Sequence, residues 1–310
     1  MSFSNYFDSR KTTELIGHRE KFIFFKSLIL LNKLPNVLLL SGEKGIGKST
    51  LINHIMHYYF DRNNYDENNF TFQKSKFHNQ YLNNIFPNIV YLTGSDFKNV
   101  KVDDVRILKK NLNKSSILND KRFIILDDVE TFNLNTLNGL LRIIEEPSKD
   151  NYFILINNKT KPLIETIRSR CIELKIILDT NERKFMLSKL LEIFIQKNDN
   201  KKIFTGSSPG NILKFKLLFH EKKIDINDNF LLNFNKILNL YKKEKNTTYR
   251  ELLLFFTENY FENLNNKKKV NYEKIIENRL FIVKSINEFF LYNLNQNALL
   301  NSIENKLFYE

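Results

Sequence analysis

Cysteine is almost absent from this chain, because Cys171 is the only one among 310 residues. A single thiol excludes an intramolecular disulfide framework and any zinc site built from several cysteines, so we expect no zinc. The first ten residues carry no apolar signal-peptide core, and no apolar stretch is long enough to cross a bilayer. We therefore expect a cytoplasmic protein with no membrane partner.

Glycine and proline are also scarce, with 8 and 5 residues, and tryptophan is missing. Where the few glycines fall in an ordered pattern, that pattern is informative. Hydrophobic residues make up 42% and charged residues 27%, which is typical of a globular protein rather than a disordered one. The length exceeds that of a usual single core and predicts two or three domains.

Acidic residues are in the minority, since 35 Asp and Glu oppose 48 Lys and Arg for a net charge of +13. Phosphate contacts in nucleic-acid complexes are made largely by Lys and Arg, so the excess favours DNA as a partner. The chain is also rich in Asn, Lys, Ile and Phe, which is typical of AT-rich coding sequence. Both interpretations of the charge stay open.

Short apolar blocks alternate with segments of helical period, of which Leu134 to Ile144 is the clearest. This alternation predicts an α/β fold, a parallel sheet with helices on both faces. The polar stretch from Asp61 to Lys76 shows no periodicity and is expected to be a loop or insertion. The predicted strands are 36–40, 89–92, 123–126, 152–156 and 172–176.

Beyond Asp179 the strand-like blocks stop and only helical patterns follow. We expect helices at 183–196, 211–220, 229–241, 249–263 and 272–294. The change in pattern predicts a nucleotide-binding domain at 1–178, and a second, less marked change divides the remainder into 179–223 and 224–310.

The segment Gly42 to Ser49 fits the phosphate-binding pattern G-x-x-x-x-G-K-[ST] in full, between a predicted strand and a predicted helix. Glycines let backbone N–H groups curl around phosphates, Lys48 reaches the terminal phosphates, and the Ser49 hydroxyl ligates Mg²⁺. The expected cofactors are ATP and Mg²⁺. The candidate nucleotide-binding residues here are Gly42, Gly45, Gly47, Lys48, Ser49 and Thr50.

An acidic pair ends the predicted strand at 123–126, as a P-loop site requires. Asp127 is expected to bind nucleotide and, with Ser49, to hold the magnesium ion. Asp128 takes the catalytic position of a water-activating carboxylate. Its side chain is one methylene shorter than that of Glu, so its reach to the attacking water is left open.

Three further segments resemble a known family. Asn138 to Pro147 is similar to the N-A-L-L-K-x-L-E-E-P helix of clamp-loader subunits, and Thr166 to Cys171 is similar to their S-R-C segment. Gly206 to Gly210 resembles the small-domain motif of the delta-prime type. The likeness covers most of the first 178 residues and implies an AAA+ P-loop domain, then a small helical lid domain and an all-α C-terminal collar domain.

The resemblance also implies roles for single residues. Arg170 of the S-R-C segment would be an arginine finger that completes the nucleotide site of a neighbouring subunit. Asn158 stands near the sensor-1 position that contacts the terminal phosphate, with Asn157 as the alternative. The chain departs from the family at Asn211, where a sensor-2 arginine is expected, and it lacks the four-cysteine zinc module that many relatives carry.

The function that the resemblance implies is a delta-prime-like subunit of the DNA polymerase III clamp loader. Its partners would be the other loader subunits, gamma/tau and delta, in a hetero-oligomer, together with the sliding clamp and primer-template DNA. The pair Asp127–Asp128 favours delta-prime over gamma/tau, in which Asp-Glu is usual. A gamma/tau-like motor ATPase and a DNA-binding adaptor with a vestigial P-loop are the alternatives.

Overall fold

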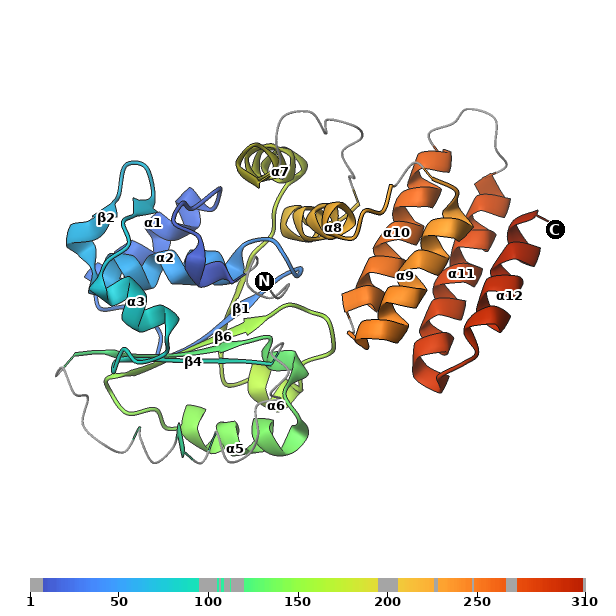
Figure 1. Cartoon of the computed structure of the whole chain (residues 1–310). Coiled ribbons are helices and arrows are strands. Elements are labelled where there is room, and N and C mark those ends of the chain that lie inside the picture. The colour runs from blue at the N-terminus through green and yellow to red at the C-terminus, as the bar shows by residue number, and fades with distance from the viewer. Residues whose placement is uncertain are drawn as a thin grey trace. The chain divides into compact units, whose positions relative to one another are not determined.

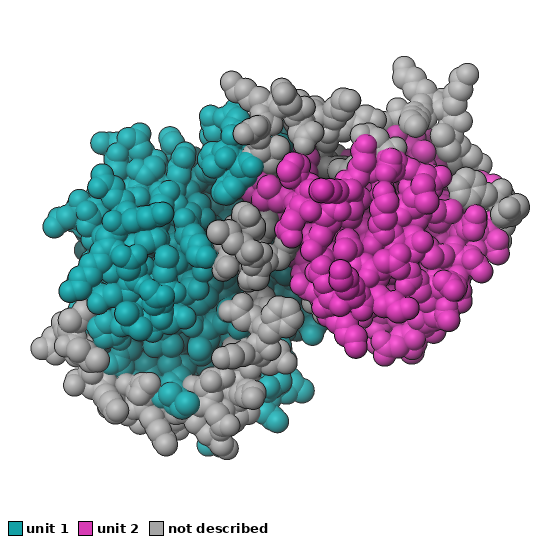
Figure 2. Space-filling view, in the orientation of Figure 1, with its two compact units in different colours: residues 1–194, 208–210 teal, residues 195–207, 211–310 magenta. Residues whose placement is uncertain are grey.

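A computed structural model of the chain describes residues 8–94, 105, 107–108, 112, 120–194, 206–225, 228–246, 248–265 and 272–308. The chain forms two compact units, residues 1–194 with 208–210 and residues 195–207 with 211–310 (Figure 2). Within the described residues, no helix is long and apolar enough to span a membrane. The finer division at 178 and 223 stays a prediction.

A five-stranded parallel sheet lies at the centre of the first unit, in the order β4-β5-β6-β1-β7. The five predicted strands are all present, with ends shifted by about one residue, as is usual for strand boundaries. Their bounds are β1 Val37–Ser41, β4 Ile89–Thr93, β5 Arg122–Asp127, β6 Asn151–Asn157 and β7 Ile172–Lys175.

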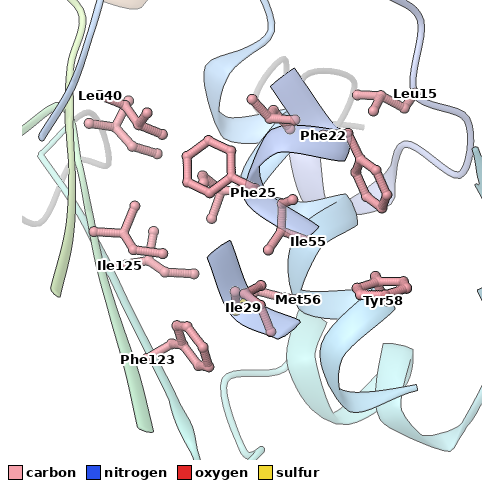
Figure 3. Packing of buried hydrophobic residues seen from close by; sticks show 14 of the residues in the cluster. Leu15, Phe22, Phe25, Ile29, Leu40, Ile55, Met56, Tyr58, Phe123 and Ile125 are labelled. Carbon is pink, nitrogen blue, oxygen red and sulfur yellow. The ribbon is translucent and has the colours of Figure 1, made fainter. Parts of the chain in front are cut away.

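Helices cover both faces of this sheet, as predicted (Figure 1). One face carries α1 (Arg19–Leu30), α2 (Lys48–Phe60) and α3 (Lys76–Leu82), and the other carries α5 (Leu134–Ile144) and α6 (Glu165–Arg168). Because strand side chains alternate, β1 and β5 supply both cores. Figure 3 shows the first of them, where Leu40 and Ile125 of the strands lie opposite Phe25 and Ile55 of the helices.

The segment from Asp61 to Lys76, expected as a loop, contains regular structure and corrects that prediction. After the short 3-10 helix η3 (Arg62–Asn64), strands β2 (Tyr65–Asp66) and β3 (Thr71–Phe72) form an antiparallel hairpin. Tyr65 stacks on Phe22 and Phe72 stacks on His57, so the hairpin is held by aromatic side chains above α2. Strands of two residues are too short to leave a periodic pattern in the sequence.

The described part of the first unit also contains two further 3-10 helices and one further α-helix. These are η2 (Ser9–Lys11), η4 (Val129–Thr131), which directly follows the acidic pair, and α7 (Thr180–Phe194). The first two residues of α8 (Pro209–Glu221) also belong to this unit.

The described part of the second unit contains no strand, which confirms the predicted helical region. It consists of the remainder of α8, from Asn211 on, and of α9 (Phe230–Glu244), α10 (Thr248–Asn265), α11 (Tyr272–Tyr292) and α12 (Gln296–Phe308). Helix α10 packs against α9 and α11, and α11 packs against α12. The core between them includes the fully buried side chains of Phe234, Ile237, Leu252 and Ile282. Helix α12 was not among the predicted elements.

Candidate functional site

The P-loop joins the end of β1 to the start of α2. Its last glycine, Gly47, has φ 94° and precedes the first helical residue, Lys48. A side chain at this left-handed position would be strained, and a Cβ there would lie 3.2 Å from His18 Nε2. Helix α2 therefore begins with its unpaired N–H groups at the loop, which is the arrangement that binds phosphate in P-loop proteins.

The ammonium of Lys48 lies inside this loop, with only 2% of the residue exposed. Its Nζ donates to the carbonyl oxygens of Gly42 at 2.8 Å and Glu43 at 2.7 Å. Burial lowers the pKa of Lys48 to about 8, against the opposing pull of the carboxylates of Asp127, Glu130 and Asp128. A buried cation with so few protein partners is suited to an anionic ligand.

Asp127, at the end of β5, reaches the first turn of α2. The Ser49 hydroxyl donates to Asp127 Oδ2 at 2.7 Å, and the Tyr91 hydroxyl of β4 donates to the same oxygen at 2.7 Å. Burial raises the pKa of Asp127, and the neighbouring charge of Asp128 raises it further. Ser49 and Asp127 thus present two oxygen ligands side by side, which suits a hard cation such as Mg²⁺. Thr50 lies half-buried in the same turn of α2.

Asn158, rather than Asn157, lies beside the acidic pair. Asp128 has φ 54° and is buried, and its Oδ1 accepts a hydrogen bond of 2.5 Å from Asn158 Nδ2. The side-chain oxygen of Asn157 instead accepts from the backbone of Lys159 at 2.8 Å, as in an ordinary loop cap. Of the two asparagines considered for the sensor-1 position, Asn158 is the one that contacts the acidic pair.

Glu130 is a buried carboxylate of this site that the sequence did not single out. It accepts from the backbone N–H of Asn158 at 3.1 Å and from the Thr160 hydroxyl at 2.8 Å. These bonds fix the loop after β6, and so the position of Asn158 relative to Asp128. The sequence did not predict this role, because the partners of Glu130 follow β6, about 30 residues further along the chain.

The segment that begins α8 contacts the P-loop directly. The Ser208 hydroxyl donates to the carbonyl of Lys44 at 2.5 Å, and the Gly210 N–H donates to the carbonyl of Gly45 at 2.9 Å. A Cβ at Gly210 would lie 2.6 Å from that same oxygen, so only glycine allows this approach. Ser208 and Gly210 of this motif thus donate one side-chain and one backbone hydrogen bond to the loop. Asn211 belongs to the second unit.

Arg170 lies apart from this cluster, at the ends of α5 and α6. Its Nε donates to Glu145 Oε1 at 2.7 Å, its Nη2 pairs with the same oxygen at 2.7 Å, and its Nη1 donates to the Thr166 carbonyl at 2.8 Å. The side chain of Arg170 is 36% exposed. The structure therefore brings Gly42 to Thr50 together with Asp127, Asp128 and Asn158, and places Arg170 on the surface of the same unit.

The strand order, the P-loop between β1 and α2, and the acidic pair at the end of β5 define a P-loop protein of the AAA+ fold. A crystal structure of a DNA polymerase III gamma subunit-related protein from Thermotoga maritima has this fold in common with the chain. The two align with a TM-score of 0.52 and 16% identity over 91% of this chain and 96% of that one.

The sequence model of the family described as DNA polymerase III, delta subunit, matches residues 17–179, and the chain belongs to that family. The DNA polymerase III subunit delta' of Buchnera aphidicola subsp. Baizongia pistaciae is 25% identical over 250 residues, 74% of this chain and 72% of the relative. That of Pseudomonas aeruginosa is 36% identical over 76 residues, 24% of this chain and 23% of the relative. The similarity is thus to the delta-prime type of clamp-loader subunit.

Proposed function

We propose that this chain assembles with other clamp-loader subunits and supplies Arg170 to the nucleotide site of its neighbour. The position of Arg170 supports this proposal. Its guanidinium lies at the surface and, among the described residues, makes no contact with the chain's own P-loop. A guanidinium in that position complements the charge of a transferring phosphoryl group. The assembly would load the sliding clamp onto primer-template DNA in the cytoplasm.

The chain's own P-loop site is proposed to bind ATP with Mg²⁺. Lys48 would contact the terminal phosphates, and Ser49 with Asp127 would hold the metal, which neutralises charge on the phosphates when bound. The close pairing of Ser49 and Asp127 supports this assignment.

Turnover at this site is proposed to be weak. The Asp128 carboxylate accepts a hydrogen bond from Asn158. Its side chain is short, and its backbone is in the left-handed conformation. These features restrict its use as a general base for water. The chain would then contribute more to ATP hydrolysis at its neighbour's site than at its own, whereas a gamma/tau-like motor would hydrolyse ATP at its own site.

The proposal is tested by replacing Arg170 with Ala in the reconstituted loader and measuring ATP hydrolysis in the presence of clamp and primed DNA. We expect the rate at the site that Arg170 completes to fall by about a thousandfold, because arginine fingers contribute at least that much in related reactions. Arg168→Ala is the matched control, since Arg168 is an exposed arginine paired with Glu165 and Glu173. An unchanged rate in Arg170→Ala would remove the finger role.

A DNA-binding adaptor with a vestigial P-loop is the competing proposal, and the net charge of +13 favours it. It requires salt-sensitive binding of duplex DNA by the isolated chain without any nucleotide binding. Heat released on titration with ATP, and lost in Lys48→Ala, would exclude the adaptor.

A further inference from the structure

Glu145 and Arg170 are distant in sequence and meet at the ends of two helices on one face of the sheet. Glu145 is the C-terminal cap of α5, and Arg170 is the second residue after α6. Both elements are anchored next to the contact, because Ile144 and Ile167 are buried in the same hydrophobic core. The two side chains therefore extend from fixed backbone positions.

The contacts divide the five N–H groups of the guanidinium unevenly. Glu145 Oε1 takes the Nε hydrogen and one Nη2 hydrogen, both at 2.7 Å. Nη1 donates to the Thr166 carbonyl at 2.8 Å and reaches Ser169 Oγ only at 3.4 Å. Within the described residues, one Nη2 hydrogen has no acceptor. The carboxylate thus binds the Nε and Nη2 edge of the guanidinium and leaves the second Nη2 hydrogen free to donate.

This ion pair adds little to the stability of the fold. The side chains of Arg170 and Glu145 are 36% and 42% exposed, and ion pairs between exposed side chains contribute little to stability. A free arginine side chain, by contrast, samples many rotamers, and ordering it has a large entropic cost. The contact is therefore more useful for orientation than for stability.

We propose that Glu145 is a positioning residue that sets the orientation of Arg170 before it meets the phosphates of the neighbouring subunit. The inference rests on the proposed finger role of Arg170. Because Glu145 holds Nε and Nη2, the remaining Nη2 hydrogen already has a fixed direction. The guanidinium therefore loses less entropy when the transition state forms.

The experiment uses the reconstituted loader with clamp and primed DNA, and compares Glu145→Ala with the wild type. We expect kcat for ATP hydrolysis to fall about fivefold at an unchanged KM, because orientation matters in the transition state rather than in nucleotide binding. Glu145→Gln keeps the acceptor oxygen and should return to within about twofold of wild type. Glu146→Ala is the control, since Glu146 is exposed and has no ion pair among the described residues.

A double variant separates positioning from a general structural effect. Glu145→Ala should cause no further loss in an Arg170→Ala background, because a positioning residue acts only through the group it positions. Equal losses in both backgrounds, an unchanged rate, or a faster rate in Glu145→Ala would each overturn the inference. An unchanged rate in Arg170→Ala alone would instead show that the finger role itself is wrong.

The contact also has a readout independent of hydrolysis. In the isolated chain, the NMR signal of the Arg170 Nε–H should be sharp and should exchange slowly with water. It should broaden in Glu145→Ala but persist in Glu145→Gln. A signal that is the same in the wild type and Glu145→Ala would contradict the orienting contact whatever the loader's activity.

Discussion

Lys48 shows how burial tunes a single residue of the proposed nucleotide site. Its ammonium is enclosed by the P-loop and donates to two backbone carbonyls, and the loss of water lowers its pKa to about 8. A bound phosphate would supply negative charge at this position and raise the pKa again. Protonation of Lys48 and nucleotide binding are therefore expected to favour each other.

We predict that ATP affinity weakens as the pH rises through about 8. The free protein loses the Lys48 proton above that pH, whereas the nucleotide-bound form keeps it, so binding must take up a proton at alkaline pH. Isothermal calorimetry between pH 7 and pH 9 should show an affinity loss approaching tenfold per pH unit above pH 8. Lys48→Arg, which stays charged throughout, is the control, and the same pH dependence in that variant would contradict the assignment.

At this scale the sequence predicted residues whose partners are close in the chain or fixed by a motif. Gly42 to Ser49 and Asp127 were found because a P-loop requires them at set positions. The sequence did not predict the roles of three other residues, because their partners are distant in the chain. Tyr91 contacts Asp127, Glu130 contacts the loop after Asn157, and Glu145 contacts Arg170. Only the folded chain makes these pairs.

At the scale of elements, the segment that leads into α8 is joined to the P-loop by two hydrogen bonds, one from a side chain and one from the backbone. Ser208 and Gly210 donate to consecutive carbonyls of the loop, at Lys44 and Gly45. A movement of this segment would change the position of those carbonyls. The chain has Asn211 where a sensor-2 arginine was expected, and the two residues Ser208 and Gly210 just before it bond directly to the P-loop.

We predict that Gly210→Ala weakens ATP binding about tenfold. Helix propensity alone would stabilise α8 by about 1 kcal/mol, but the new Cβ would lie 2.6 Å from the Gly45 oxygen and force the loop to shift. Gly206→Ala is the control, because the nearest atom to its Cβ is Glu262 Oε2, at 3.7 Å. Calorimetric affinities that are equal in the two variants would show that the contact does not govern binding.

The sequence predicted the long elements and missed the short ones, for a physical reason. The five strands of the parallel sheet and the amphipathic α5 carry a pattern over a whole element. The hairpin of β2 and β3 has two residues per strand, and it is stabilised by aromatic contacts with α1 and α2 rather than by local pattern. Its stability comes from tertiary packing.

At the scale of the whole molecule, the first unit buries basic side chains that are neutral when the protein is folded. His54 and His57 of α2 are both 0% exposed, and His57 Nε2 lies 3.4 Å from His78 Nδ1 of α3. Burial lowers the pKa of His54 to about 3 and that of His57 to about 2, and it also lowers the pKa of His78. The fold is therefore sensitive to acid through these side chains.

We predict that the first unit loses stability as the pH falls below 6.5. The unfolded chain binds protons at its histidines near that pH, whereas the folded chain does not, so their contribution is complete above 6.5 and decreases toward the lowered pKa values. Urea unfolding between pH 6.5 and pH 5 should show a loss of about 1.4 kcal/mol per pH unit for each such histidine. His57→Phe should reduce this slope and the exposed His220→Gln should not; equal slopes would refute the prediction.

By itself the sequence determined the P-loop, the acidic strand end, the parallel α/β class and the helical C-terminal part, because each depends on residues that are near one another in the chain. The strand order, the contact of Asn158 with Asp128, the contacts of Ser208 and Gly210 with the P-loop and the pairing of Glu145 with Arg170 were decided only by the tertiary structure. Each of these joins segments that are far apart in sequence, and local pattern carries no information about which distant segments will pack together.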